Sequence, residues 1–180
     1  MTKLKFRALA RHIVANRIAA GCLMLLMALP SANTAQATER GSVTNLPLPR
    51  YVSIKSGEVN VRRGPSLTHR IDWVFARKDM PLEITAEHGH WRRVRDRDGA
   101  GGWVHYSLLS GTRTVIVDQE MLPLLSRPDQ AAPATAQLEQ GVVARLDNCT
   151  TDWCRLSVAG YRGWAPKSAL WGVKPDELRD

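Results

Sequence analysis

The chain has 180 residues, of which 25 are Lys or Arg and 17 are Asp or Glu, so its formal net charge is +8. A hydrophobic content of 44% and a charged content of 23% are typical of a globular protein and exclude a disordered or collagen-like chain. Five of the basic residues and none of the acidic ones lie within the first 37 positions, which leaves a net charge of +3 for the rest. We therefore expect no nucleic-acid partner.

Residues 1–37 have the features of a secretory signal peptide. A basic segment is followed by an uncharged apolar stretch at 18–29, and Ala35, Gln36 and Ala37 fit the small-x-small pattern of cleavage sites. We predict cleavage after Ala37 and export to the periplasm or beyond it. The apolar stretch is shorter than the about 20 residues of a spanning helix, so we expect no permanent membrane span after cleavage. An uncleaved signal anchor remains an alternative.

The exported part begins with a polar segment, 38–50, that ends in alternating Leu and Pro residues and predicts an extended linker. From residue 51 the sequence changes to short apolar runs separated by turn residues, which is typical of β-strands. No segment after the leader has the apolar periodicity of a helix. Strands are predicted at 59–61, 73–75, 82–86, 91–95 and 102–104, and then at 115–117, 121–125, 142–146, 153–158 and 163–165.

These strands form two similar copies of one unit. Trp91 recurs 62 positions later as Trp153, and Trp103 recurs 61 positions later as Trp164. We expect these four indoles to pack in or near the cores. Five short strands in about 60 residues favour closure into a small barrel, because closure covers the exposed strand edges. The predicted fold is all-β, with one barrel at 51–117 and a second at 118–175, and the strand 115–117 opens the second copy.

The cysteines predict a disulfide. Cleavage after Ala37 removes Cys22 and leaves the pair Cys149 and Cys154, which lie on either side of a predicted hairpin turn. Cysteines facing each other across such a hairpin are within disulfide distance. A metal site or a catalytic cysteine is disfavoured, because the second copy of the unit, which contains both cysteines, has no histidine.

The sequence VNVRRGPS at 59–66, followed by Gly102, Trp103 and Val104, resembles the bacterial SH3-like domain family. The sequence ALWGV at 169–173 is similar to the end of tandem, exported members of that family in proteobacteria. The resemblance covers about 51–173 and implies barrels of five or six strands. It also implies binding to peptidoglycan or peptides rather than catalysis. The second copy lacks the Asn and the Gly of the motif, because its equivalent segment at 122–129 reads LPLLSRPD.

We predict a ligand groove between the loop at 60–66 and the turn at 87–90 of the first copy. Residues 51–117 contain 11 basic and 7 acidic residues, whereas 118–180 contain 7 and 9. The arginines of the first copy are therefore candidates to pair with the carboxylates of stem peptides, and Trp73 is a candidate to stack on the ligand. The alternatives are a motif that only shapes its loop and arginines on a solvated strand face. The candidate ligand-binding residues are Asn60, Arg62, Arg63, Trp73, Arg93 and Arg95.

The predicted function is that of a non-catalytic periplasmic binding module for peptidoglycan or its stem peptides, acting through the first barrel. The alternative is a protein–protein interaction or scaffolding module of the cell envelope. The sequence contains no nucleophile–base pattern, phosphate loop or metalloprotease motif, so we expect no enzyme and no cofactor. His88 and His90 flank a turn, and no further ligand completes a metal site beside them. The expected partner is peptidoglycan or an envelope protein.

Overall fold

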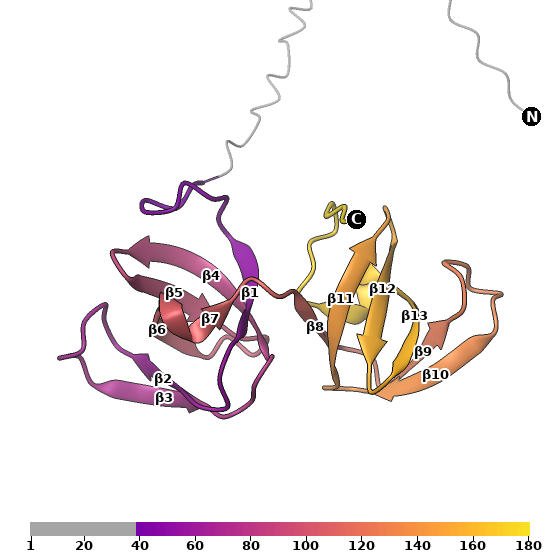
Figure 1. Ribbon diagram of the computed structural model, residues 1–180, viewed down its shortest axis with the longest axis horizontal. Coiled ribbons are helices and arrows are strands. Elements are labelled where there is room, and N and C mark those ends of the chain that lie inside the picture. Colours follow the sequence, from indigo (N-terminus) through magenta and orange to yellow (C-terminus); the bar gives the residue numbers. More distant parts are fainter. Residues whose placement is uncertain (1–38) are drawn as a thin grey trace, which may run out of the picture. The chain divides into compact units, whose positions relative to one another are not determined.

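A computed structural model describes residues 39–180 (Figure 1). These residues form two sheets of seven strands each in tandem, and their only helical elements are two short 3-10 turns. The predicted all-β fold with two copies is therefore confirmed. Within the described residues, no helix has the length and apolar character that a membrane span requires. The predicted signal peptide and its cleavage after Ala37 lie outside these residues.

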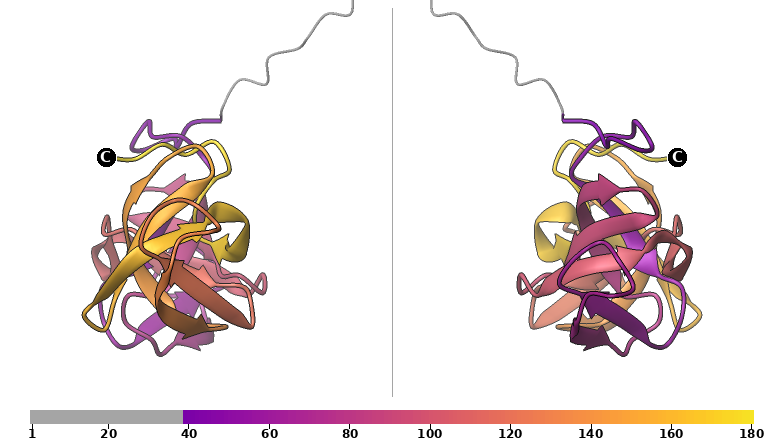
Figure 2. Two further views of the ribbon diagram at one scale, coloured as in Figure 1. Left: turned by 90° about the vertical axis from the view of Figure 1, so that its right-hand side faces the viewer. Right: turned by 90° about the vertical axis from the view of Figure 1, so that its left-hand side faces the viewer.

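The first barrel is an antiparallel sheet in the order β3-β2-β6-β5-β4-β1-β7. The ribbon views of Figure 2 show that the strands are curved, and the strands of this barrel enclose one hydrophobic core. A 3-10 turn, Tyr106–Leu108, follows β6. The strands are β1 (Arg50–Ile54), β2 (Val59–Arg62), β3 (Ile71–Phe75), β4 (Pro81–His88), β5 (Trp91–Arg95), β6 (Gly101–His105) and β7 (Leu109–Ser110).

The second barrel repeats this topology strand for strand, in the order β10-β9-β13-β12-β11-β8-β14. A 3-10 turn, Lys167–Ala169, again follows the sixth strand. The repeat seen in the sequence is thus a repeat of the whole fold. The strands are β8 (Thr114–Val117), β9 (Met121–Leu125), β10 (Ala134–Glu139), β11 (Val143–Cys149), β12 (Trp153–Val158), β13 (Tyr161–Pro166) and β14 (Leu170–Trp171).

The observed strands differ from the predicted ones at a few points. The strand β8 pairs with β11 and β14, so it belongs to the second barrel, and the boundary predicted at residue 117 moves to just before Thr114. Its residues Val115 and Val117 are fully buried in the second core, which explains the assignment. The strand β10 was not predicted, because Leu138 is its only large apolar residue. Its pairing with β9 decides its conformation.

The four recurring tryptophans lie outside both cores. Trp91, Trp103, Trp153 and Trp164 are all half-buried and belong to neither hydrophobic core, so burial within the cores is wrong. Side chains alternate between the two faces of a strand, and the inward positions are taken by smaller residues such as Val104, which is fully buried. The indoles are therefore left on the outer faces of the barrels.

The segment 39–49 is folded onto the first barrel, and the extended linker predicted there is wrong. Its backbone forms a turn in which Gly41 N donates to Leu46 O at 2.8 Å and Asn45 N donates to Gly41 O at 2.9 Å. Leu48, at 5% exposure, is part of the first hydrophobic core. Leu48, one of the alternating Leu and Pro residues that predicted a linker, instead anchors the segment in the core.

The predicted disulfide is confirmed. Cys149 and Cys154 are directly opposite each other at the ends of β11 and β12, and they are bonded. Both are buried in the second core, at 5% and 0% exposure. The bond therefore closes the β11–β12 hairpin from inside the barrel.

Replacing both Cys149 and Cys154 by Ala is expected to lower the free energy of unfolding of the second barrel by about 2 kcal/mol, because the closed loop is short. Urea unfolding monitored by tryptophan fluorescence measures this loss. Unfolding of the first barrel should be unchanged and serves as the internal control. A double variant as stable as the native protein would show that the bond does not stabilise the hairpin.

Candidate ligand-binding groove

A groove of about 540 Å³ opens on the first barrel between the β2–β3 loop and the β4–β5 turn. One wall is formed by Pro65, Ser66 and Leu67 of the loop, and the other by His90, Trp91 and His105. Strand pairing places Trp91 of β5 directly opposite His105 of β6, so the second wall is part of the sheet. The groove lies between the two segments from which a groove was predicted.

Aromatic rings form most of the second wall. The ring centroids of Trp91 and His105 are 5.5 Å apart, and those of His90 and His105 are 5.8 Å apart. Tyr106 extends the cluster, with its ring 5.6 Å from that of His90 and 5.0 Å from that of His105. On the opposite wall Leu67 is 74% exposed. The groove therefore offers aromatic faces and an apolar side chain to a ligand.

The imidazole of His105 adds a directional hydrogen-bonding group. The backbone N–H of Ser107 donates to His105 Nδ1 at 3.4 Å, and Ser107 Oγ lies 2.7 Å from the same nitrogen. Both contacts use Nδ1, so the other ring nitrogen, Nε2, is the one left to form a hydrogen bond with a ligand.

The loop wall is held in shape by one of the predicted binding residues. Arg62 Nη1 donates to Leu67 O at 3.0 Å and to His69 O at 2.7 Å. A side-chain Cβ at Gly64 would lie 2.5 Å from the ring of His69, so a larger residue there would require the exposed His69 ring to move. Arg62 therefore positions the wall, which agrees with the interpretation of the motif as a loop-shaping element.

Three other predicted residues lie on the β2–β3 hairpin outside the groove. Arg63 donates to Asp72 at 2.9 Å, and hydrogen bonds from Arg63 and Arg70 hold the pKa of Asp72 below its usual value. Asn60 is exposed on β2. Trp73 is 49% exposed on β3, where its ring contacts Phe75 at 6.4 Å between centroids. The exposure expected for Trp73 is thus observed, and its role in binding stays a prediction.

Arg93 and Arg95 lie on the outer face of β5, away from the groove. Arg95 forms an ion pair with Glu83, and the hydrogen bond in this pair raises the pKa of Arg95. Arg93 is exposed and forms no ion pair within residues 39–180. The two arginines border a smaller depression of about 280 Å³ near Gly101. The six predicted residues are therefore distributed over separate surfaces, and the structure does not bring them together as one site.

The groove residues that the sequence did not identify come from three separate segments. Leu67 is a single apolar residue in a polar loop, and Trp91 had been assigned to the core. Tyr106 follows β6 in the 3-10 turn, and its backbone N–H donates to His90 O at 2.9 Å, which joins the two ends of the wall. Pairing of β5 with β6 in a hairpin places His90 and Trp91 beside His105 and Tyr106. This pairing is the sequence signal that could have identified the aromatic wall.

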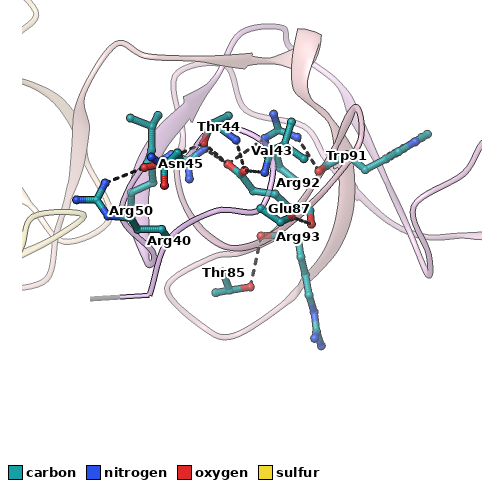
Figure 3. A network of polar contacts seen from close by, with 12 residues as sticks. Arg40, Val43, Thr44, Asn45, Arg50, Thr85, Glu87, Trp91, Arg92 and Arg93 are labelled. Atoms are coloured by element: carbon teal, nitrogen blue, oxygen red, sulfur yellow. Dashed lines mark hydrogen bonds and ion pairs between the residues drawn. The ribbon is translucent and has the colours of Figure 1, made fainter. Parts of the chain in front are cut away.

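A buried carboxylate, Glu87, lies beside the β4–β5 turn and is the centre of a network of polar contacts (Figure 3). Its side chain has no exposed surface, and it accepts hydrogen bonds from Val43 N at 3.0 Å and from Thr44 N at 2.8 Å. Thr44 Oγ1 donates at 2.7 Å and Arg50 Nη2 at 2.6 Å. Arg92 lies 3.5 Å away as a second cation. These contacts attach the folded segment 39–49 to the barrel.

The network reaches the groove through Arg92. Its Nη1 donates to Gly89 O and Trp91 O, both at 2.9 Å, and its guanidinium lies 5.9 Å from the centre of the Tyr106 ring. Gly89 has a φ of 49°, which favours glycine in this tight turn. Glu87 and Arg92 together therefore fix the turn that carries the aromatic wall.

The hydrogen bonds to Glu87 determine its ionisation. Burial by itself would raise the pKa of the carboxyl group, but the bonds from Thr44, Arg50 and Val43 outweigh that effect. They lower the pKa from 4.5 to about 2. Glu87 is therefore ionised at neutral pH, and its charge is neutralised inside the protein by Arg50 and Arg92.

Comparison with protein families gives one match, which covers more than half of the chain. The family model described as Bacterial SH3 domain matches residues 55–111 and 118–172, one segment in each barrel. No curated protein matches the chain.

Two solved structures from Trichomonas vaginalis, described as NlpC2 and NlpC1, are similar at 16% and 14% sequence identity. The similar regions cover 68% and 73% of this chain and 48% of each of those chains, with a TM-score of 0.32 for both. The chain thus spans about half the length of these structures. At this TM-score the similarity supports no statement about function.

Proposed function

Because this chain belongs to the bacterial SH3 domain family, we propose that it is a non-catalytic binding module that holds peptidoglycan or its stem peptides in the groove of the first barrel. Bacterial SH3 domains are binding domains, and the groove of this barrel has an aromatic lining. Its composition is the observation that carries the proposal: His90, Trp91 and His105 line the groove together with the exposed Leu67.

Each component of the groove suits a part of this ligand. Aromatic faces such as that of Trp91 pack against the apolar faces of sugar rings and against peptide units. The Nε2 of His105 is suited to a hydrogen bond with a hydroxyl group, which can donate to it or accept from it. The volume of about 540 Å³ accommodates a short segment of an extended polymer rather than a globular partner.

The disulfide supports a location outside the cytoplasm. Disulfides persist in oxidising compartments such as the periplasm and are rare where thiols are kept reduced. The bond between Cys149 and Cys154 is therefore consistent with export and with access to the cell wall. The predicted periplasmic location also depends on the signal peptide at 1–37.

A second candidate function, a protein–protein interaction module, is favoured by the edge strand β3. This strand pairs only with β2 among the described residues, and it exposes Ile71, Trp73 and Val74 at 42%, 49% and 44%. An open edge with apolar side chains suits the addition of a strand from another protein. In that case Trp73 would contact a protein partner and the groove would stay empty.

Co-sedimentation with isolated peptidoglycan sacculi tests the proposed function. The purified protein without residues 1–37, with its disulfide intact, is expected to pellet with sacculi at low and at moderate salt. The groove is lined by uncharged aromatic groups, and screening affects mainly charge pairs. Absence of pelleting at either salt would contradict the proposal. Pelleting that disappears with salt would move the ligand to the exposed arginines, such as Arg93.

A further inference from the structure

We infer that the second barrel carries its own groove, which binds an extended peptide through a free ammonium group on the ligand. A cavity of about 520 Å³ lies on this barrel, bounded by the β9–β10 loop, the β11–β12 turn and the residues after β13. The inference goes beyond the proposed function, because it concerns the other barrel and a ligand group of defined charge. The lining includes Gln130, Thr151, Asp152, Trp153, Pro166 and Lys167.

This cavity occupies the same place in the second barrel as the aromatic groove occupies in the first. The loop wall is built in the same way, since Asp129 N donates to Arg127 O at 2.8 Å just as Ser66 N donates to Gly64 O at 2.9 Å. The loop conformation is therefore retained although the second copy has Arg127 where the first has Gly64. The departure from the family motif has not removed the groove.

The opposite wall is also equivalent. Lys167 N donates to Asp152 O at 2.9 Å, as Tyr106 N donates to His90 O at 2.9 Å in the first barrel. Strand pairing places Trp153 opposite Pro166, just as it places Trp91 opposite His105. The second groove thus keeps an indole in the same position, and the residues on either side of it have changed.

The changes replace two imidazoles with a carboxylate and a proline. Asp152 takes the position of His90, and Pro166 takes that of His105. The carboxylate of Asp152 is exposed and forms no hydrogen bond or ion pair with any other side chain between residues 39 and 180. Lys167 also lines the groove, but it is buried and its Nζ donates to Pro175 O at 3.0 Å and to Glu177 O at 2.7 Å. Asp152 is therefore the charged lining side chain without a bonding partner among residues 39–180, whereas the ammonium of Lys167 is held by two carbonyl groups.

These features together determine the class of ligand. A primary ammonium beside Asp152 gains a charge-assisted hydrogen bond, and the adjacent Trp153 ring is suited to a cation over its face. The apolar lining from Pro166, Leu170 and Val173 suits the aliphatic part of a peptide that carries this ammonium. Residues 118–180 contain 9 acidic and 7 basic residues, which also disfavours an anionic ligand such as a nucleic acid or an acidic lipid.

A matched pair of peptides tests the inference with the same protein preparation. The probes are acetyl-Ala-Ala-Lys-Ala-amide, which has a free side-chain ammonium, and the same peptide with that nitrogen acetylated. The readout is the NMR signal of the Trp153 indole N–H during titration. The free-amine peptide is expected to shift this signal and to bind about tenfold more tightly than the acetylated peptide, because acetylation removes the charge-assisted bond.

Two variants locate the effect. Asp152→Asn keeps the size of the side chain and is expected to reduce affinity for the free-amine peptide about tenfold, to the level of the acetylated peptide. Glu120→Gln removes an exposed acid before β9 of the same barrel, outside the groove lining, and is expected to change nothing. Circular-dichroism melting checks that both variants remain folded.

Three results would overturn the inference: no shift of the Trp153 signal at millimolar free-amine peptide, equal affinity for both peptides, or unchanged affinity in Asp152→Asn. A shift confined to Trp91 would also overturn it, because the peptide would then occupy the first barrel. Pelleting with sacculi that is lost in Trp91→Ala reports the first groove, whereas the peptide titration read at Trp153 reports the second. Failure of one proposal can therefore be distinguished from failure of the other.

Discussion

The replacement Glu87→Gln is expected to reduce the free energy of unfolding of the first barrel by about 3 kcal/mol at neutral pH. The change in the pKa of Glu87 from 4.5 to about 2 corresponds to a stabilisation of this size. A neutral amide also leaves the half-buried guanidinium of Arg50 and the buried one of Arg92 without their counter-charge, which is costly inside a protein. Urea unfolding monitored by fluorescence measures the loss.

A matched control is Glu58→Gln, because Glu58 is an exposed acid of the same barrel and forms no side-chain hydrogen bond within the described residues. Its stability should remain within about 0.5 kcal/mol of the native protein. If Glu87→Gln were equally neutral, the network around Glu87 would contribute nothing to stability.

The same carboxyl group gives a pH dependence with a definite sign. Its pKa is lower in the folded protein than in the unfolded chain, so its contribution is fully present above about pH 4.5. The contribution is lost as the pH falls towards 2. The native first barrel should therefore lose stability in this range, and Glu87→Gln should lose less. Parallel acid-stability curves for the two proteins would contradict this assignment.

The replacement Trp91→Ala is expected to weaken binding to sacculi at least tenfold, because truncation of a central aromatic residue removes the largest contact surface of a groove. The matched control is Trp73→Ala, which removes an exposed indole on β3 of the same barrel. This control is expected to bind like the native protein. The measurement is the fraction of protein that pellets with sacculi across a range of sacculus concentrations.

The Trp91 and Trp73 variants also separate the two candidate functions. Loss of binding in Trp73→Ala with normal binding in Trp91→Ala would place the ligand on the β3 edge and contradict the groove. Trp91 is half-buried, so the melting curve of its variant must first show a folded barrel. A double variant is then unnecessary, because each single variant gives a distinct result.

The fold could be predicted because its signals are local or periodic. Strands such as β5 alternate inward and outward residues, and the spacing from Trp91 to Trp153 revealed two copies of one unit. The disulfide was predictable for the same reason, since Cys149 and Cys154 flank a single hairpin turn. Turn residues and alternation were therefore sufficient to predict two copies of one β fold. The strand order is the same in the two barrels.

The folded segment 39–49 could not be predicted, because its anchor is distant in sequence. Thr44 and Glu87 are 43 positions apart, and no periodic pattern connects a polar segment with a glutamate near a strand end. The sequence Leu-Pro-Leu-Pro was instead interpreted as a linker. Its Leu48 is instead buried in the first core, while Val43 and Thr44 of the same segment are bonded to Glu87.

The candidate site was predicted in position but not in composition. Alternation predicted that Arg93 and Arg95 share one face of a strand, and that face is exposed. Arg95 nevertheless pairs with Glu83 across β4 and β5, a partner that spacing alone does not identify. Arg62 likewise donates to a backbone carbonyl group of the β2–β3 loop, a partner that spacing alone does not identify. Side-chain partners follow from strand register, and a single irregular pairing such as the shift between Ile84 and Ala86 changes them.

The most direct test of the account is the NMR response of the tryptophan indole signals to a soluble disaccharide–peptide fragment of peptidoglycan. We expect the Trp91 signal to shift as the fragment is added, because Trp91 forms the centre of the aromatic wall, while the signal of Trp73 stays in place. A shift of Trp73 without one of Trp91, or no shift of any indole at millimolar fragment, would contradict the proposal that the first groove binds peptidoglycan.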